Sequence, residues 1–165
     1  MSAGPAPGGS PAASGGPVAL AILVGGLVGA VLLLAAELTT LYRIGSPSGA
    51  AVRSYGTGAH HNYAMGLIAV LVAFLALGVW RTHSRSALLA IGVLSVIALL
   101  IALLGDLPDA QATGLLRAGP AGYVSAGAHP STGLYLETLG AVVLLITSVG
   151  GFVLAGPSPR RRAGA

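Results

Sequence analysis

The chain contains four acidic residues among 165, and each lies close to one end of a long apolar segment. Carboxylates in such positions commonly bind an ion, pair with another charge or line a water-filled path. A His-His-Asn run at residues 60–62 adds polar side chains just before another apolar segment. These residue types predict a polar pocket for a proton, a cation or a small polar ligand. The candidate pocket residues are Glu37, Glu137, Asp106, Asp109, His61 and Asn62.

The two glutamates also have a purely structural interpretation. Glu37 and Glu137 can accept hydrogen bonds from loop amides or tyrosines, or pair with Arg53 and Arg117, and so fasten the adjoining loops to the helices. Ion pairs near a surface contribute only about 0–1 kcal/mol and are common without any ligand. On the sequence alone, the structural and the functional interpretation both stand.

Metal binding is a narrower form of the pocket hypothesis. Zinc and manganese accept histidine nitrogen and carboxylate oxygen, so the candidate ligands are His60, His61, Glu37 and Glu137. The sequence has no HExxH or comparable ligand spacing, and two adjacent histidines on a helix point about 100° apart. We therefore expect no bound metal and no cofactor. Because no Walker loop, nucleophile elbow or other catalytic motif is present, we name no catalytic residues and do not expect an enzyme.

The composition places the chain in a membrane. Hydrophobic residues make up 55% of it and charged residues 7%, which is more apolar surface than a soluble core of this size can bury. There is no cysteine, so disulfides and thiolate metal sites are excluded. The net charge of +4 comes from eight arginines that form no groove-sized patch, so we expect no nucleic-acid partner.

Four segments are long enough to cross a hydrocarbon core of about 30 Å, which takes roughly 20 residues. They predict an all-α bundle of four transmembrane helices at residues 18–42, 63–80, 87–105 and 133–155. A cleaved signal peptide is the rival interpretation of the first segment, although residues 1–17 contain no Lys or Arg. Residues 1–17 are rich in Gly, Pro, Ser and Ala, which predicts a disordered tail. Residues 156–165 form a basic tail.

The arginines predict how the bundle is oriented. Five of them flank one side of the predicted membrane, namely Arg81, Arg85, Arg160, Arg161 and Arg162. Three flank the other side, namely Arg43, Arg53 and Arg117. Because the more positive side faces the cytoplasm, we expect both termini in the cytoplasm. The longer loops, residues 43–62 and 106–132, then lie outside.

Helical spacing puts the glutamates on faces lined by small residues. Residues three and four apart share a face, so Glu37 lies on the face of Gly29 and Glu137 on that of Gly140. Small residues mark close helix contacts in membranes, and Gly25 and Gly29 have GxxxG spacing. We expect both glutamates to face the bundle interior, about 8 Å below the outer ends of their helices. The expected packing residues are Gly25, Gly29, Gly66 and Gly140.

The two outer loops carry signals of local structure. GAAVRSYG and AGYVSAGAH place Val and Tyr between glycines, which predicts two short strands that pair as a hairpin-like cap. In DLPDAQATGLLR, Pro108 disfavours continuation of the third helix, and Asp106 or Asp109 can cap a short amphipathic helix that follows. We therefore expect a small extracytoplasmic cap over the bundle.

The segments ELTTLYRI, GTGAHHNYA, LLGDLPDAQATG and STGLYLETLGAV resemble small four-helix integral membrane proteins of actinobacteria, which carry no assigned activity. The resemblance covers about residues 34–145. It implies a multi-pass protein of the bacterial plasma membrane and implies no substrate.

Two functions from different classes fit these features. The first is a non-enzymatic accessory or structural subunit, whose cap contacts a membrane-protein partner or a second copy of the chain. The second is a small permease or sensor for a proton, an ion or a small solute, built on Glu37 and Glu137. Purification in mild detergent separates the two, since a stable hetero-complex favours the first and a lone homo-oligomer keeps the second.

Labelling of single cysteines introduced into this cysteine-free chain tests the predicted orientation. A cysteine at Ser125 should react with an impermeant thiol reagent in intact cells, because residues 106–132 are expected outside. A cysteine at Ser84 should react only after the membrane is permeabilised. Labelling at Ser84 alone in intact cells would show that the chain is inserted the other way round.

Overall fold

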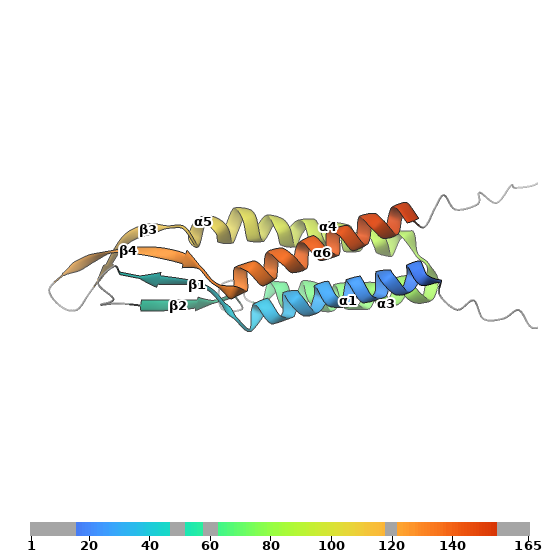
Figure 1. Ribbon diagram of the computed structural model, residues 1–165, viewed down its shortest axis with the longest axis horizontal. Coiled ribbons are helices and arrows are strands. Elements are labelled where there is room, and N and C mark those ends of the chain that lie inside the picture. Colours follow the sequence, from blue (N-terminus) through green and yellow to red (C-terminus); the bar gives the residue numbers. More distant parts are fainter. Residues whose placement is uncertain (1–15, 47–51, 58–62, 118–121, 155–165) are drawn as a thin grey trace, which may run out of the picture.

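A computed structural model of the chain describes residues 16–46, 52–57, 63–117 and 122–154. Four long helices form one half of an elongated molecule, and a small β-sheet extends from one end of them (Figure 1). We call this end of the helices the sheet end. The candidate residues His60, His61 and Asn62 lie outside the described residues.

The four predicted apolar helices are present. They are α1 (Pro17–Glu37), α3 (Ala64–Thr82), α4 (Arg85–Leu100) and α6 (Thr132–Leu154). α4 continues through the π-helix η1 (Ile101–Asp106) into the single turn α5 (Leu107–Asp109). All four spans are long and apolar enough to cross a membrane, yet only 28% to 33% of each apolar window is buried inside the protein. The remaining apolar surface needs lipid around it, as in a multi-pass membrane protein.

The first helix ends at Glu37, so the predicted boundary at residue 42 is wrong. The β-branched and aromatic residues that follow, Thr39, Thr40 and Tyr42, favour a strand over a helix. The N–H of Leu38 bonds to helix carbonyls at the last turn, and the chain then enters strand β1 (Thr40–Gly45). Glu37 consequently lies at the end of α1 and not about 8 Å below it.

A four-stranded antiparallel sheet extends the bundle, so the prediction of an all-α fold is wrong for this part. The other strands are β2 (Val52–Gly56), β3 (Thr113–Arg117) and β4 (Tyr123–Pro130), and the order is β2-β1-β4-β3. The two predicted strands exist as β2 and β4, but β1 lies between them. The predicted amphipathic helix is instead β3, because five residues rarely form a stable helix and β4 offers them a hydrogen-bonded ladder.

The third span continues past Pro108, which is a further correction to the sequence prediction. Leu107 donates its N–H to the carbonyl of Ala102, five residues back, in the wider pattern of a π-helix. In a regular α-helix a proline ring clashes with the carbonyl four residues back, and the wider turn before Pro108 accommodates the ring. The N–H of Ala110 then bonds to the carbonyl of Asp106 at 2.8 Å and closes the last turn.

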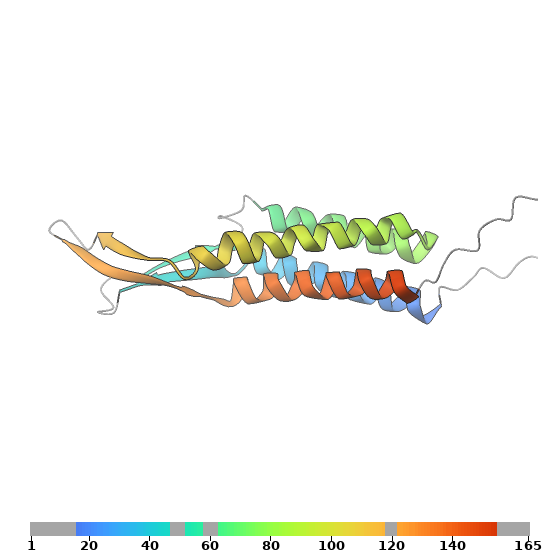
Figure 2. The same cartoon turned by 90° about the horizontal axis from the view of Figure 1, so that it is seen from above.

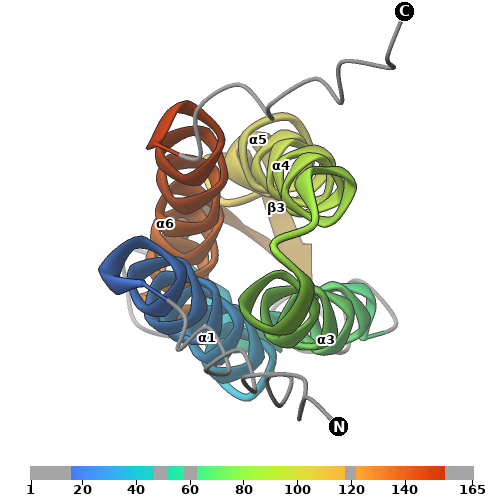
Figure 3. The same ribbon diagram turned by 90° about the vertical axis from the view of Figure 1, so that its right-hand side faces the viewer.

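The order of the strands matches the order of the helices. β1 follows α1, β2 leads into α3, β3 follows α4 and β4 leads into α6. Seen along the long axis, α1 and α6 are neighbours, with α3 beside α1 and α4 beside α6 (Figure 3). The strand order β2-β1-β4-β3 therefore repeats the helix order α3-α1-α6-α4, and β4 runs directly into α6 (Figure 2).

The bundle interior away from the sheet is apolar. Aliphatic side chains from all four helices fill it, among them the fully buried Leu33, Val72, Ile91 and Leu144. Two serines are buried there, and each hydroxyl donates to a backbone carbonyl of α4, from Ser95 at 2.7 Å and from Ser148 at 2.7 Å. A second apolar cluster joins the sheet to the helices and consists of Leu41, Tyr42, Ala110, Ala128 and Leu134.

α1 and α6 pack with their backbones in contact at Gly29 and Gly140. A Cβ added at Gly29 would lie 2.5 Å from the side chain of Leu144 and 3.2 Å from the carbonyl oxygen of Gly140. A Cβ added at Gly140 would lie 3.1 Å from Leu33 and 3.2 Å from the carbonyl oxygen of Gly29. These two glycines therefore set the separation of the two helices.

The other two predicted packing glycines differ from each other. A Cβ at Gly25 would overlap the side chain of Thr147, so Gly25 belongs to the same α1–α6 contact. A Cβ at Gly66 would reach only ordinary contact with Glu37, at 3.6 Å. Gly66 is therefore not needed to bring helices together.

Gly29→Leu and Gly140→Leu should each lower the free energy of unfolding by about 1–3 kcal/mol or more, because a large side chain has no room there. Gly150→Leu on α6 is the control, since a Cβ at Gly150 meets nothing within 4 Å and leucine is the better helix former. Thermal melting in detergent measures the difference. Equal melting temperatures for all three variants would show that α1 and α6 do not pack in this way.

Candidate functional site

Three of the four carboxylic acids lie together inside the sheet end of the bundle. Glu37 is 6% exposed, and Asp106 and Glu137 are fully buried. Glu137 lies within hydrogen-bonding reach of Asp106 and close enough to Glu37 for their charges to interact. The fourth acid, Asp109, is exposed on α5 and does not join them. We call Glu37, Asp106 and Glu137 the acidic cluster.

Each member of the acidic cluster comes from a different span. Glu137 stands on the inward face of α6, in one stripe with Gly140 and Leu144. Glu37 is the last residue of α1, which packs directly against α6. Asp106 is the last residue of the π-helix η1, and single π-helical turns inside α-helices are frequent at functional sites. The acidic cluster therefore forms only if α1, α6 and the third span keep their positions relative to one another.

Glu37 has a structural role. Its Oε1 accepts a hydrogen bond from the N–H of Gly66 at 2.8 Å, and Gly66 is the third residue of α3. The residue before α3, Tyr63, provides no side-chain cap, so Glu37 satisfies a free N–H at this helix terminus from a neighbouring helix. The predicted alternative partners, Arg53 and Arg117, are exposed on the edge strands β2 and β3.

Glu137 is in a different situation from Glu37. Neither of its carboxylate oxygens has a hydrogen-bond donor among the described residues, although Asp106 is within reach. Two ionised carboxylates are both acceptors, so a hydrogen bond between them requires a bound proton. A buried charge without a partner is costly, and two like charges in one site resist double ionisation. The pair formed by Glu137 and Asp106 is therefore built to hold one proton or another small cation.

The sheet meets α6 one helical turn from Glu137. Thr57, the residue after β2, is fully buried, and its Oγ1 has no hydrogen-bond partner among the described residues. A Cβ added at Gly133 would lie 2.7 Å from that oxygen and 2.8 Å from the carbonyl oxygen of Thr40. Gly133 lies one helical turn from Glu137, so polar atoms of the sheet reach the start of α6 directly above the acidic cluster.

Tyr42 marks the boundary between the cluster and the sheet. Its ring is 7% exposed and stacks on Tyr55 with 5.2 Å between centroids. Burial, followed by the charges of Asp109, Tyr55 and Asp106, raises the pKa of the Tyr42 hydroxyl above its ordinary value. The hydroxyl therefore stays protonated near neutral pH and is an uncharged neighbour of Asp106.

The geometry does not form a metal site within the described part of the chain. Among those residues, no group of three or more His, Asp or Glu side chains is arranged to hold a metal ion. The predicted histidine ligands, His60 and His61, lie outside the described residues.

Three groups at this site were not predicted from the sequence. They are the amide of Gly66, the hydroxyl of Thr57 and the close approach at Gly133. The amide of any residue is invisible to a search for polar side chains, and Thr57 lies in a loop rich in glycine and polar residues. Only the contact between the sheet and α6 makes Thr57 and Gly133 neighbours.

Comparison of the chain with protein-family models, with curated protein sequences and with solved structures gave no match.

Replacement of Glu37 tests its role at the start of α3. Glu37→Ala should lower the free energy of unfolding by about 1 kcal/mol, as the loss of a helix cap does. Glu37→Gln keeps a carbonyl oxygen for the Gly66 N–H and should lose less. Thermal melting of both variants near neutral pH makes the comparison. If the alanine variant melts like the parent, the bond from Gly66 contributes nothing to stability.

Proposed function

We propose that this protein is a non-enzymatic, multi-pass membrane protein that senses pH by binding a proton between Glu137 and Asp106. The observation that carries the proposal is the pair itself. Glu137 is fully buried and has no donor for either oxygen among the described residues, and it lies within hydrogen-bonding reach of a second fully buried acid. A shared proton turns two competing acceptors into a hydrogen-bonded pair.

The surroundings favour a sensor over a permease. Beyond the acidic cluster the bundle interior is filled by aliphatic side chains, and its two buried serines donate to backbone carbonyls. A proton or ion path usually needs a chain of ionisable residues or water between both sides. In the described interior, the acids are confined to the sheet end.

Binding or loss of the proton can also alter the contact between α6 and the sheet. Glu137 lies one turn from Gly133, where the carbonyl of Thr40 and the hydroxyl of Thr57 approach the helix. Repulsion between Glu137 and Asp106 after loss of the proton pushes α6 away from the third span, and so acts on the contact between α6 and the sheet. Among the described titratable groups, Glu37 from α1 interacts with Glu137, and Tyr42 from β1 interacts with both Asp106 and Asp109.

A role as an accessory subunit is the second candidate, and the sheet favours it. β2 and β3 are the edge strands, and an edge strand presents backbone groups that a strand of another protein can pair with. Leu115 on β3 is 71% exposed and Tyr123 at the start of β4 is 70% exposed. This surface lies at the far side of the sheet from the acidic cluster, so the two functions are compatible.

Melting temperature as a function of pH tests the proton site. The parent should lose stability as pH rises, because the unfolded chain releases at lower pH a proton that the folded protein still holds between two acids. The loss approaches about 1.4 kcal/mol per pH unit over the range in which only the folded protein holds this proton, and it ends once the folded protein also releases it. Glu137→Gln carries a permanent amide donor toward Asp106, so this variant should keep its stability at high pH. Ser148→Ala, which changes a buried polar residue elsewhere in the bundle, should follow the parent.

Two results would contradict this function. If the parent and Glu137→Gln have the same dependence on pH, the pair holds no titrating proton. If a divalent cation raises the melting temperature of the parent at high pH and leaves Glu137→Gln unchanged, the ligand is a metal ion and not a proton.

A further inference from the structure

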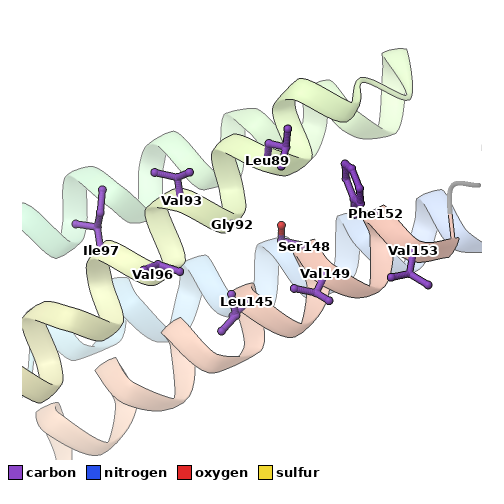
Figure 4. A pocket seen from close by; sticks show the side chains of 10 residues that line it. All are labelled: Leu89, Gly92, Val93, Val96, Ile97, Leu145, Ser148, Val149, Phe152 and Val153. Atoms are coloured by element: carbon purple, nitrogen blue, oxygen red, sulfur yellow. The ribbon is translucent and has the colours of Figure 1, made fainter. Parts of the chain in front are cut away.

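A groove runs along the outer surface of the bundle between α4 and α6, in the half remote from the sheet. Its volume is about 440 Å³. Figure 4 shows its walls, which are formed by Leu89, Val93 and Ile97 on α4 and by Leu145, Val149 and Val153 on α6. Ser148 is the one polar side chain that lines it, and its hydroxyl is already bonded to the carbonyl of Leu88 at 2.7 Å. The groove therefore offers a ligand hydrocarbon contacts only.

Small residues at the floor of the groove explain its shape. A Cβ added at Gly92 would lie 2.7 Å from Ser148 Oγ, so α4 and α6 approach closely at this level. The larger side chains on either side are turned outward, with Val93 59% exposed and Val149 54% exposed. Two helices that touch through small residues and carry branched residues on both flanks leave a trough between the flanks.

One end of the groove carries a positive charge. Phe152 lines this end, and the guanidinium of Arg85 lies over its ring, 5.6 Å from the centroid. A cation–π contact of this kind holds the guanidinium at the mouth of the groove. Arg81 is exposed in the last turn of α3, at the same end of the bundle. The groove is thus apolar along its length and cationic at its mouth, which complements an amphipathic anion.

We propose that this groove binds one acyl chain of an anionic phospholipid, with the phosphate of the headgroup paired to Arg85. The apolar walls lie on the outer surface of the bundle, which lipid covers in a membrane. Basic side chains near a membrane surface attract anionic headgroups by about 1 kcal/mol each. The site is separate from the acidic cluster and does not depend on the proposed pH response.

A helix from a second copy of the chain is the competing occupant, and the charge at the mouth of the groove disfavours it. A symmetric dimer in a membrane presents the same patch from both copies. It would bring the Arg85 ends of two grooves to the same depth, where their charges repel.

A second groove on the same pair of spans provides an internal control. Its volume is about 400 Å³, and it is lined by Leu103, Leu107, Tyr135 and Leu139 among others, nearer the sheet. No arginine lines it. A comparison of the two grooves separates lipid binding that needs the charge of an arginine from the general contact of lipid with an apolar surface.

Native mass spectrometry of the purified full-length protein tests the site. The protein is mixed with phosphatidylglycerol or with phosphatidylcholine of the same acyl chains, and bound lipids are counted. The parent should retain one phosphatidylglycerol with a preference of about five- to tenfold over phosphatidylcholine. Val93→Trp, which fills the groove, and Arg85→Gln, which removes the charge, should each abolish the preference. Arg85→Lys should retain it, and Leu139→Trp in the second groove should leave it unchanged.

Three outcomes would overturn the proposal. The first is equal binding of the two lipids by the parent, which indicates a general lipid contact. The second is an unchanged preference in Val93→Trp, which places the anionic lipid elsewhere. The third is a dimer in the parent that Val93→Trp dissociates, which identifies a second copy of the chain as the occupant. Circular dichroism and gel filtration confirm that each variant is folded before lipids are counted.

Discussion

The close approach of α1 and α6 is the contact on which the rest of the structure depends. Gly29 and Gly140 let the two backbones touch, and the same pair of chain segments continues beyond the helices as β1 and β4, the two central strands of the sheet. Glu37 ends α1 and Glu137 lies in the second turn of α6, so this contact also fixes where both glutamates lie. A wider separation would therefore disturb the helix packing, the sheet and the acidic cluster together.

Within the cluster, the acids divide into two kinds by their partners. Glu37 has a backbone donor at the free end of α3, and a carboxylate at a helix N-terminus is favoured by both the hydrogen bond and the helix dipole. Glu137 faces another acid instead. A carboxylic acid kept in an apolar bundle without a donor among the described residues costs stability, which a purely structural role does not explain. This cost is what distinguishes Glu137 from a residue that only fastens a loop.

The sequence predicts the membrane part well and the sheet poorly, for physical reasons. Long apolar segments and small residues at three- and four-residue spacing are local signals, and they predict the helices and the inward faces that carry Glu37 and Glu137. The end of α1, the course of the chain past Pro108 and the pairing of β1 between β2 and β4 depend on contacts between distant segments. The hydrogen bond from the Gly66 N–H to Glu37 joins residues 29 positions apart and leaves no sequence pattern in either segment.

The position of the acidic pair at the junction of sheet and bundle bears on what proton binding can do. Proton binding deep in the apolar core would change only how the helices pack. At a site in the sheet, water would screen the charge and weaken its effect. At the junction, Glu137 is fully buried, yet it lies one turn from Gly133, where atoms of Thr40 and Thr57 approach α6. Charge is most costly where water is excluded, and a movement is most effective where two rigid parts meet. Both conditions hold at the start of α6, which is why we propose that a single proton there changes how the sheet sits on the helices.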